Sequence, residues 1–263
     1  MYFIFILGPA GSGKSYLTYS FTNWLIEHGM DIAIVNLDPA VTWLPYTPDV
    51  DIRDYITVEE VMRKYNLGPN GALVATIDLS INFIENLRNE IDELKANYVV
   101  VDTPGQMELF AFRSAGPTIM SSLALNDKSV VLFLVESTIL VKPSTFLSLI
   151  MLALAASIAH KLPQIITITK TDLLPRERYE DIIRWIEDPM EIFKDIKSED
   201  AVFVTQYSDV IAAFEDIIAR FNIGGFVATS SITGQGLDEL YALVQRVLIG
   251  GEDFYTEEPS EIL

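Results

Sequence analysis

The sequence predicts an α/β fold built on one mostly parallel β-sheet, and three observations lead to this prediction. Short apolar runs alternate with longer segments of helical periodicity, which is typical of successive βαβ units. The apolar runs are nearly continuous, as expected for strands that helices cover on both faces. The chain has 263 residues and half of them are apolar, so its length suits one large α/β domain.

The elements follow one another in a regular order along the chain. The expected strands are residues 2–7, 32–37, 98–102, 129–136, 163–169 and 225–229. The expected helices are residues 14–27, 57–65, 71–95, 116–125, 143–160 and 237–248. Helical segments separate the successive strands, so most neighbouring strands should be parallel.

One block interrupts this alternation. Residues 176–222 are charged and helix-like, with Pro175 before them and Pro189 inside them. We interpret them as a helical insertion in a domain that spans residues 1–250, either a lid over a ligand or a solvated decoration. Residues 251–263 carry acidic residues and no basic ones, so we expect a loose C-terminal tail.

The charge balance and the absence of cysteine exclude several classes of function. The chain has 18 Lys and Arg against 37 Asp and Glu, a net charge of −19. Such a chain is a poor general binder of nucleic acid or anionic membranes, so we expect neither as a partner. Without cysteine there is no disulfide framework, no thiolate metal site and no Cys nucleophile.

Two apolar segments bear on membrane insertion. The first seven residues lack a basic flank and run into glycines, which makes a poor signal peptide. Residues 146–159 fall short of the roughly 18–20 residues that span a bilayer. We therefore expect a cytoplasmic protein, in which this segment is a buried helix or a subunit interface.

A glycine-rich loop follows the first expected strand. Residues 8–15 read G-P-A-G-S-G-K-S and match the pattern G-x-x-x-x-G-K-[ST] in full. Glycines let successive backbone N–H groups point at phosphate oxygens, and the next helix adds its dipole. Lys14 should reach the β- and γ-phosphates, and the Ser15 hydroxyl should bind Mg²⁺. The fold is therefore predicted to be a three-layer α/β/α P-loop NTPase with a helical insertion.

Carboxylates end two of the neighbouring strands, where open α/β sheets bind ligands. Asp102 follows an apolar strand and should hold Mg²⁺ through water. Residues 102–105 read D-T-P-G, so the Gly105 N–H can sense a γ-phosphate. Asp38 ends the second strand, where an acidic residue can equally be a turn former.

A third motif indicates the base. Residues 167–172 read T-I-T-K-T-D and resemble the N/T-K-x-D guanine motif, in which Asp172 accepts both N1–H and the exocyclic amine. Adenine would leave this carboxylate unpaired. The Lys170 stem should lie along the base. Thr169 replaces the commoner Asn, which should cost one loop-bracing hydrogen bond. Residues 230–236 resemble the S-A-x-x-G-x-G loop that offers an N–H to guanine O6.

Residues 65–72 read Y-N-L-G-P-N-G-A and complete a pattern with N-L-D-P-A at 36–40, D-I-R-D at 51–54 and D-T-P-G-Q-M-E at 102–108. This pattern resembles the GPN-loop GTPases of the SIMIBI class, as a single-domain, archaeal-type member. The resemblance implies a homodimer in which the loop Gly68, Pro69 and Asn70 crosses the interface. Asn70 would then approach the partner's phosphates. Without the resemblance, these residues are a turn in which Asn70 caps the next helix.

The resemblance and the motifs together give a set of candidate residues. We expect Gln106 and Asp38 to position the attacking water. The predicted catalytic residues are Lys14, Asp38, Asn70, Asp102 and Gln106, and the predicted metal ligands are Ser15, Asp38 and Asp102. The predicted nucleotide-binding residues are Gly8, Gly11, Ser12, Gly13, Lys14, Ser15, Tyr16, Gly105, Thr169, Lys170, Asp172, Ser230 and Ser231.

The expected function is a Mg²⁺-dependent hydrolase that converts GTP to GDP and acts as a homodimeric switch, with a protein client in complex assembly suggested by the resemblance. The apolar surplus in residues 117–125 and 146–159 suits a dimer interface, or else a thickly covered monomer core. Two other functions stay open. One is a P-loop phosphotransferase with a lid of Arg176, Arg178, Arg184 and Arg220, and the other is a nucleotide-gated scaffold with negligible turnover.

Overall fold

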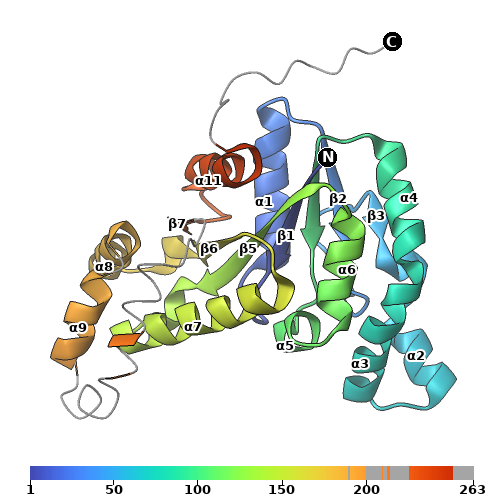
Figure 1. Ribbon diagram of the computed structural model, residues 1–263, viewed down its shortest axis with the longest axis horizontal. Helices are drawn as coiled ribbons and strands as arrows, with labels where there is room; N and C mark the ends of the chain where they lie inside the picture. Colours follow the sequence, from blue (N-terminus) through green and yellow to red (C-terminus); the bar gives the residue numbers. More distant parts are fainter. Residues whose placement is uncertain (189, 200–208, 210–211, 214–224, 251–263) are drawn as a thin grey trace.

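The computed structural model describes residues 1–188, 190–199, 209, 212–213 and 225–250, and it contains one sheet of seven parallel strands (Figure 1). Their spatial order is β3-β2-β4-β1-β5-β6-β7. The strands are β1 (Tyr2–Leu7), β2 (Ile32–Asn36), β3 (Val50–Asp51), β4 (Tyr98–Asp102), β5 (Lys128–Glu136), β6 (Gln164–Thr169) and β7 (Phe226–Ala228). The predicted α/β class with a parallel sheet is confirmed. The short edge strand β3 was not predicted.

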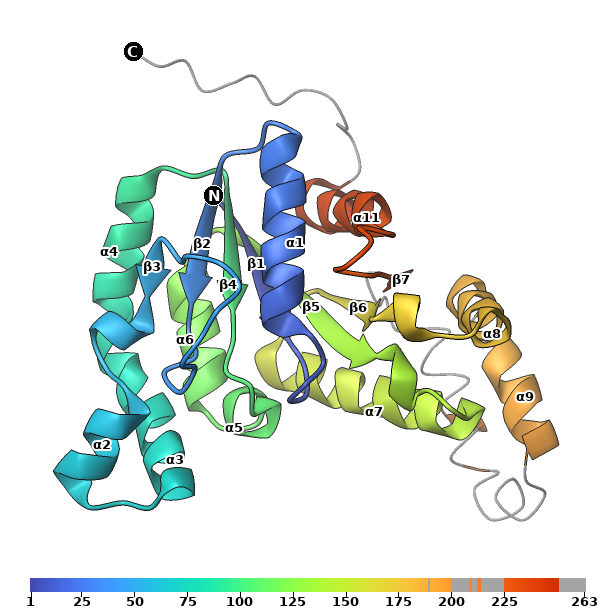
Figure 2. The same ribbon diagram turned by 180° about the vertical axis from the view of Figure 1, so that it is seen from behind.

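Helices cover both faces of this sheet. The α-helices are α1 (Lys14–Glu27), α2 (Val58–Tyr65), α3 (Pro69–Ser80), α4 (Ile84–Leu94), α5 (Met107–Ala111), α6 (Ala115–Ala124), α7 (Pro143–His160), α8 (Arg176–Glu187), α9 (Glu191–Glu199) and α11 (Leu237–Ile249). Short 3-10 helices lie at Ile52–Asp54, Ile81–Phe83, Ser137–Ile139 and Thr171–Leu173. Helices α1 and α11 lie on one face, whereas α4, α6 and α7 lie on the other (Figures 1 and 2).

Alternate residues of the strands feed two separate cores, as the two-residue period of a strand requires. Ile4 and Ile6 of β1 point toward α1 and α11, where they pack with residues such as Leu17 and Leu240. Phe3 and Phe5 point to the opposite face and join the larger core under α4, α6 and α7. The sheet is thus buried on both sides, which explains its unbroken apolar runs.

The helix expected at residues 71–95 is two helices joined by a 3-10 turn. It begins earlier, because Pro69 takes the first helical position, where its missing N–H costs nothing. The Thr76 hydroxyl donates to the Ala72 carbonyl, and the Ser80 hydroxyl donates to the Thr76 carbonyl. Such back-bonding often bends helices, and α3 gives way after Ser80 to the 3-10 turn Ile81–Phe83, which precedes α4.

The predicted insertion after β6 begins with α8 and α9, which pack on α7. The Phe146 ring lies 5.5 Å from the Trp185 ring, and Phe193 is buried in the same core. Asp195 of α9 accepts hydrogen bonds from Arg184 and from the Trp185 indole of α8. Most of residues 200–222, and the tail at 251–263, lie outside the described residues.

Helix α7 is one turn longer than the apolar run in its sequence. Its 18 residues make it, within the described residues, the one helix long and apolar enough to cross a membrane by length and composition alone. Core helices of globular proteins meet the same criterion. Several α7 residues, among them Phe146, Ile150 and Ala153, are buried in the core, whereas Met151 and Ile158 are exposed.

At the end of α7, the buried side chain of His160 predicts acid sensitivity. Its Nδ1 accepts the Leu162 N–H (3.0 Å) and its Nε2 faces Gln164 Oε1 (2.9 Å), so the ring is neutral with the proton on Nε2. Burial lowers the pKa of His160 below its usual value, despite the opposing hydrogen bond to Gln164. The unfolded chain therefore binds this proton more readily than the folded chain does. Stability is lost as the pH falls below about 6.5.

The test compares urea unfolding of the wild type and His160→Gln at pH 7.5 and 5.5. The variant should be less stable at pH 7.5 by about 1–2 kcal/mol, because one buried hydrogen-bond partner is lost. It should lose less stability than the wild type between the two pH values. Exposed His28, changed to Gln, is the control. Parallel losses in wild type and His160→Gln would contradict the prediction.

Candidate nucleotide-binding site

The candidate site lies at the carboxyl edge of the sheet, where the polar ends of four strands meet. Strand β1 leads into the glycine-rich loop at residues 8–15, which we call the phosphate-binding loop. On one side of β1, Asn36 of β2 pairs in register with Asp102 of β4. On the other side, Glu136 of β5 pairs with Thr169 of β6. This edge is the position at which parallel α/β sheets bind ligands.

Lys14 lies at the centre of the phosphate-binding loop. The loop ends at Gly13, whose φ of 95° suits glycine, and α1 begins with Lys14. The ammonium donates to the carbonyls of Gly8 (2.9 Å), Pro9 (3.0 Å) and Gly105 (3.4 Å). Burial lowers the pKa of Lys14, although the nearby negative charges of Asp102 and Asp38 oppose that effect. A buried cation is thus held in the loop, where a phosphate oxygen could replace one of these carbonyls as its acceptor.

Asp38 connects two loops at this edge. One carboxylate oxygen accepts the Ala40 N–H at 2.9 Å, a local contact that fits the turn-former interpretation. The other accepts the Gly105 N–H at 3.1 Å, across 67 residues of sequence. Burial raises the pKa of Asp38, and these two hydrogen bonds oppose the rise. Asp38 therefore both shapes its own turn and fixes the D-T-P-G segment.

Asp102 is almost completely buried, with 1% of its surface exposed. Its Oδ2 accepts the Tyr46 hydroxyl at 2.7 Å, whereas its Oδ1 has no hydrogen-bond partner among the described residues. Burial raises the pKa of Asp102 to about 6, although hydrogen bonds from Ser15 and Tyr46 oppose the rise. No sequence motif indicates Tyr46, because its hydroxyl meets Asp102 only in the folded chain.

The oxygen atoms at this position fit Mg²⁺. The Oδ1 of Asp102 is a buried, unpartnered carboxylate oxygen, and the Ser15 hydroxyl lies beside the same carboxylate. The described residues contain no group of three or more His, Cys, Asp or Glu side chains placed to hold a metal by themselves. Mg²⁺ takes few protein oxygens and completes its shell with water and phosphate, so one carboxylate and one hydroxyl are a suitable pair of protein ligands.

A network behind Asp38 holds its loop in place. The Asn36 side chain accepts the Asp38 N–H (3.0 Å) and donates to Asp51 (2.9 Å). Arg53 pairs with both oxygens of Asp51 and also donates to the Val41 carbonyl. Burial alone would raise the pKa of Asp51, but the bonds from Arg53 and Asn36 lower it. The D-I-R-D block therefore orders the segment that carries Asp38.

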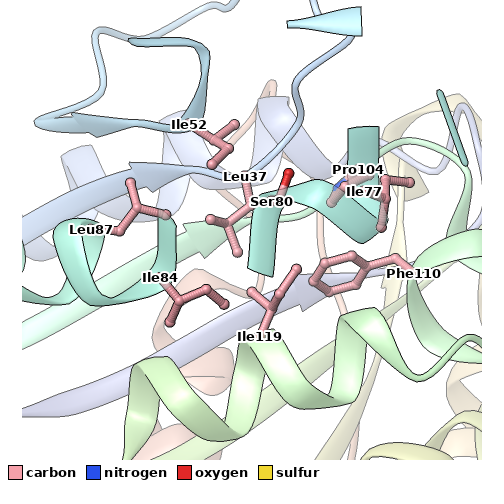
Figure 3. Close-up of a pocket in the computed structure, with 9 residues that line it drawn as sticks. All are labelled: Leu37, Ile52, Ile77, Ser80, Ile84, Leu87, Pro104, Phe110 and Ile119. Atoms are coloured by element: carbon pink, nitrogen blue, oxygen red, sulfur yellow. The ribbon is translucent and has the colours of Figure 1, made fainter. Parts of the chain in front are cut away.

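The same loops rest on an apolar cluster beneath the sheet edge (Figure 3). Leu37 precedes Asp38, Pro104 follows the Asp102 strand end, and both meet Ile77 of α3 around a void of about 10 Å³. The other lining residues are Ile52, Ser80, Ile84, Leu87, Phe110 and Ile119. This apolar contact joins the two acidic loops to the bend between α3 and α4.

A second pocket lies on the other side of the phosphate-binding loop. It has a volume of about 180 Å³ and is lined by Gly13, Tyr16, Thr169, Lys170, Asp172, Leu173, Ser231 and Ile232. Asp172 accepts the Ser230 hydroxyl at 2.6 Å, and that hydroxyl oxygen accepts the N–H groups of Ile232 and Thr233. The Lys170 ammonium pairs with Glu136 at 2.9 Å, which fixes its stem along the pocket wall.

The sequence pattern predicts that Thr169, in place of Asn, costs a hydrogen bond that braces the loop. That expectation was wrong. Its hydroxyl donates to the Ser12 carbonyl at 2.6 Å, and the side chain is buried. A hydroxyl thus provides the loop-to-loop hydrogen bond that was expected from an Asn amide. The base pocket and the phosphate-binding loop are joined directly through this bond.

The Gly-Pro-Asn loop is not gathered with these groups. Gly68 is the N-cap of α3, Pro69 is its first residue, and Asn70 stands one residue further in, so Asn70 is not the cap. Asn70 is exposed, and no hydrogen bond in the described part of the chain joins it to the phosphate-binding loop. The α2–α3 hairpin carries it beyond the body of the sheet (Figure 2). Gln106 is also exposed, at the start of α5 next to Gly105.

The hydrogen bond from Thr169 to Ser12 predicts a specific effect of Thr169→Val. This substitution keeps the shape of the side chain and removes its hydroxyl. The Ser12 carbonyl would lose its buried donor, so we expect about 1–2 kcal/mol of lost stability in urea unfolding and about ten-fold weaker GTP binding.

Thr167→Val is the matched control on the same strand. The Thr167 hydroxyl is buried without a hydrogen-bond partner among the described residues, so its removal should be neutral or stabilising. Equal effects of the two substitutions on nucleotide affinity would contradict the role of the brace.

Comparison with known proteins gives a consistent result. A family described as "Conserved hypothetical ATP binding protein" matches residues 6–249. GPN-loop GTPase 1 of Dictyostelium discoideum is 30% identical over 96% of this chain, which spans 62% of that protein's length. GPN-loop GTPase 3 of the same organism is 29% identical over 97% of this chain and 89% of its own length. The crystal structure of an apo GTPase from Pyrococcus abyssi matches with a TM-score of 0.81 and 30% identity, over 93% of this chain and 96% of that one. The chain belongs to the family of GPN-loop GTPases.

Proposed function

We propose that this protein hydrolyses GTP to GDP and phosphate with the help of Mg²⁺. One observation carries the proposal: a phosphate-binding centre at Lys14 and a base pocket at Asp172 lie on either side of one loop, bridged by Thr169 and Ser12. The names of the relatives, which are GTPases, support guanine as the base. Asp172 provides the acceptor that guanine N1–H and its amine require.

Each group at the sheet edge has a role in this proposal. Lys14 and the loop N–H groups bind the phosphates and offset the charge that develops during transfer. Asp102 and Ser15 would hold Mg²⁺, which when bound neutralises phosphate charge. Asp38 and Gln106 orient the attacking water. Because the Asp38 carboxylate is bonded to the Gly105 N–H, binding of a γ-phosphate at that N–H would release Asp38 for this role.

We extend the proposal to a homodimer in which Asn70 acts on the partner's nucleotide. The loop is exposed and projects from the body, which is the geometry needed to reach a second molecule. Pro69 fixes the start of α3, so presenting the Asn70 amide costs little ordering entropy. Met151 and Ile158 leave apolar surface on α7 that a partner could cover.

The proposed output is a conformational switch that acts on a protein client. Leu37 and Pro104 lie next to Asp38 and Asp102 and pack on the α3–α4 bend (Figure 3). A change at the γ-phosphate can therefore move the hairpin that carries Asn70. This links nucleotide state to the dimer geometry.

The observations do not favour a phosphotransferase. A kinase lid needs arginines available for the transferred phosphate. Arg176 pairs with Glu180, Arg178 with Asp181, and Arg184 with Asp181 and Asp195. Arg220 lies outside the described residues. Phosphate release from GTP by purified protein, with no acceptor present, distinguishes hydrolysis from transfer, and single-turnover measurements distinguish it from a scaffold without turnover.

The base assignment is tested by Asp172→Asn. An amide complements xanthine rather than guanine, so calorimetry should show GTP affinity falling by about 10²-fold or more while xanthosine triphosphate binds better than GTP. The change should leave Mg²⁺ dependence as in the wild type. Equal affinity losses for both nucleotides would contradict a contact between Asp172 and the base.

The dimer assignment is tested by complementation between two variants. Asn70→Ala should slow turnover by about 10²-fold with affinity kept, because one transition-state donor is lost. Lys14→Ala should abolish nucleotide binding but still present Asn70 to a partner. An equal mixture should recover roughly a quarter of the wild-type rate, since half of the dimers are mixed and each has one complete site.

Two controls accompany that experiment. Asn86→Ala removes an exposed asparagine from α4, away from the loop, and should turn over like the wild type. Sedimentation velocity with a GTP analogue shows whether dimers form. Failure of the mixture to recover activity, with dimers present, would show that Asn70 does not act in trans.

A further inference from the structure

Two exposed aromatic side chains from different parts of the chain contact each other beside the base pocket, which one of them lines. Tyr16 is 51% exposed and Trp43 is 65% exposed, and their rings lie 6.5 Å apart at an angle of 52°. Single exposed aromatics are common on protein surfaces. A contacting pair beside a ligand pocket is less easily explained by chance.

Tyr16 connects the two halves of the site. It follows Ser15 directly, so it stands on the first turn of α1, at the end of the phosphate-binding loop. The same side chain lines the base pocket opposite residues of β6 and its loop. The apolar part of that pocket comes from Leu173, Ile232 and the Lys170 stem, which leaves Tyr16 as its aromatic wall.

Trp43 belongs to a loop that is fixed to the site on both sides of it. On one side, Arg53 donates to the Val41 carbonyl at 3.1 Å. On the other, the Tyr46 hydroxyl donates to Asp102 at 2.7 Å. The indole is thus held against the ring of Tyr16, the residue that lines the base pocket.

We propose that Tyr16 stacks on the nucleoside and that Trp43 closes over Tyr16 as an outer cover, so this aromatic pair provides affinity for the nucleotide without selecting the base. The proposal rests on the proposed guanine-nucleotide function. Every base has a π-face, so stacking tolerates any base, whereas the Asp172 carboxylate discriminates between them. Affinity and selectivity would therefore come from separate side chains.

The first test measures binding of GDP, IDP and xanthosine diphosphate by calorimetry. Tyr16→Ala should weaken all three by a similar factor, about 5- to 50-fold, and Tyr16→Phe should recover most of the loss. Tyr19→Ala is the matched control, because Tyr19 is 44% exposed on the same helix and does not line the pocket. A loss confined to one base would overturn the proposal.

The second test uses the fluorescence of Trp43 as an intrinsic probe. It begins with the wild-type protein, so no substitution can destabilise the fold. The chain has three tryptophans, of which Trp185 is 2% exposed and Trp24 packs against Tyr241 from the last turn of α1. Binding of GDP should shift the tryptophan fluorescence emission of the wild type to shorter wavelength. It should also protect this fluorescence from quenching by acrylamide. Trp43→Phe should show neither change.

The outcomes separate this proposal from the one on which it rests. If Tyr16→Ala binds GDP as tightly as the wild type while Asp172→Asn still changes base preference, the aromatic wall is wrong and guanine recognition stands. If an emission shift persists in Trp43→Phe, the outer cover is wrong. If the wild-type protein binds no guanine nucleotide, the proposed function itself fails.

Discussion

The site depends on the ammonium of Lys14, buried at the carboxyl edge of the sheet. Removing such a charge from water is costly unless hydrogen bonds and opposite charges compensate it. Three backbone carbonyls accept from it, and the charges of Asp38 and Asp102 oppose the lowering of its pKa that burial causes. One positive and two negative groups leave an excess of negative charge. A divalent cation would interact with the two carboxylates, and a polyphosphate would interact with that cation and with the ammonium.

The loops around this centre hold one another in position through hydrogen bonds between residues that are far apart in the sequence. Asp38 bonds to Gly105 across 67 residues, and Tyr46 bonds to Asp102 across 56. Asn36, Asp51 and Arg53 hold the intervening segment behind the site. A change at any one of these loops therefore alters the bonds of its neighbours. This arrangement suits a site that must respond to a single phosphate.

The fold and the local motifs could be predicted well from sequence because their signals are local. Strand β1, the glycine-rich loop and α1 follow one another within 27 residues, and α1 and α7 begin and end where the sequence pattern predicted. The edge strand β3 was missed because two residues carry no pattern. The bend after Ser80 was missed because it arises from side-chain hydroxyls that bond back to the helix.

Contacts between distant residues account for most of what the sequence could not show in the site. No spacing rule links Tyr46 to Asp102. The Thr169 hydroxyl and the Ser12 carbonyl are 157 residues apart, and the expected loss at position 169 was wrong for that reason. Asn70 shows the opposite case: its motif is evident in the sequence, but the fold of the described chain does not bring Asn70 to the phosphate-binding loop.

The bond between Thr169 and Ser12 has a practical consequence for chemical genetics. An engineer who wishes to make this protein use an orthogonal nucleotide, and so to follow it alone among the GTPases of a cell, would alter Asp172 and its surroundings. Thr169 belongs to that recognition motif by its position in the sequence. Its hydroxyl, however, joins the base pocket to the phosphate-binding loop. Thr169 should be left unchanged, so that the site recognises the new base without weaker binding of the polyphosphate.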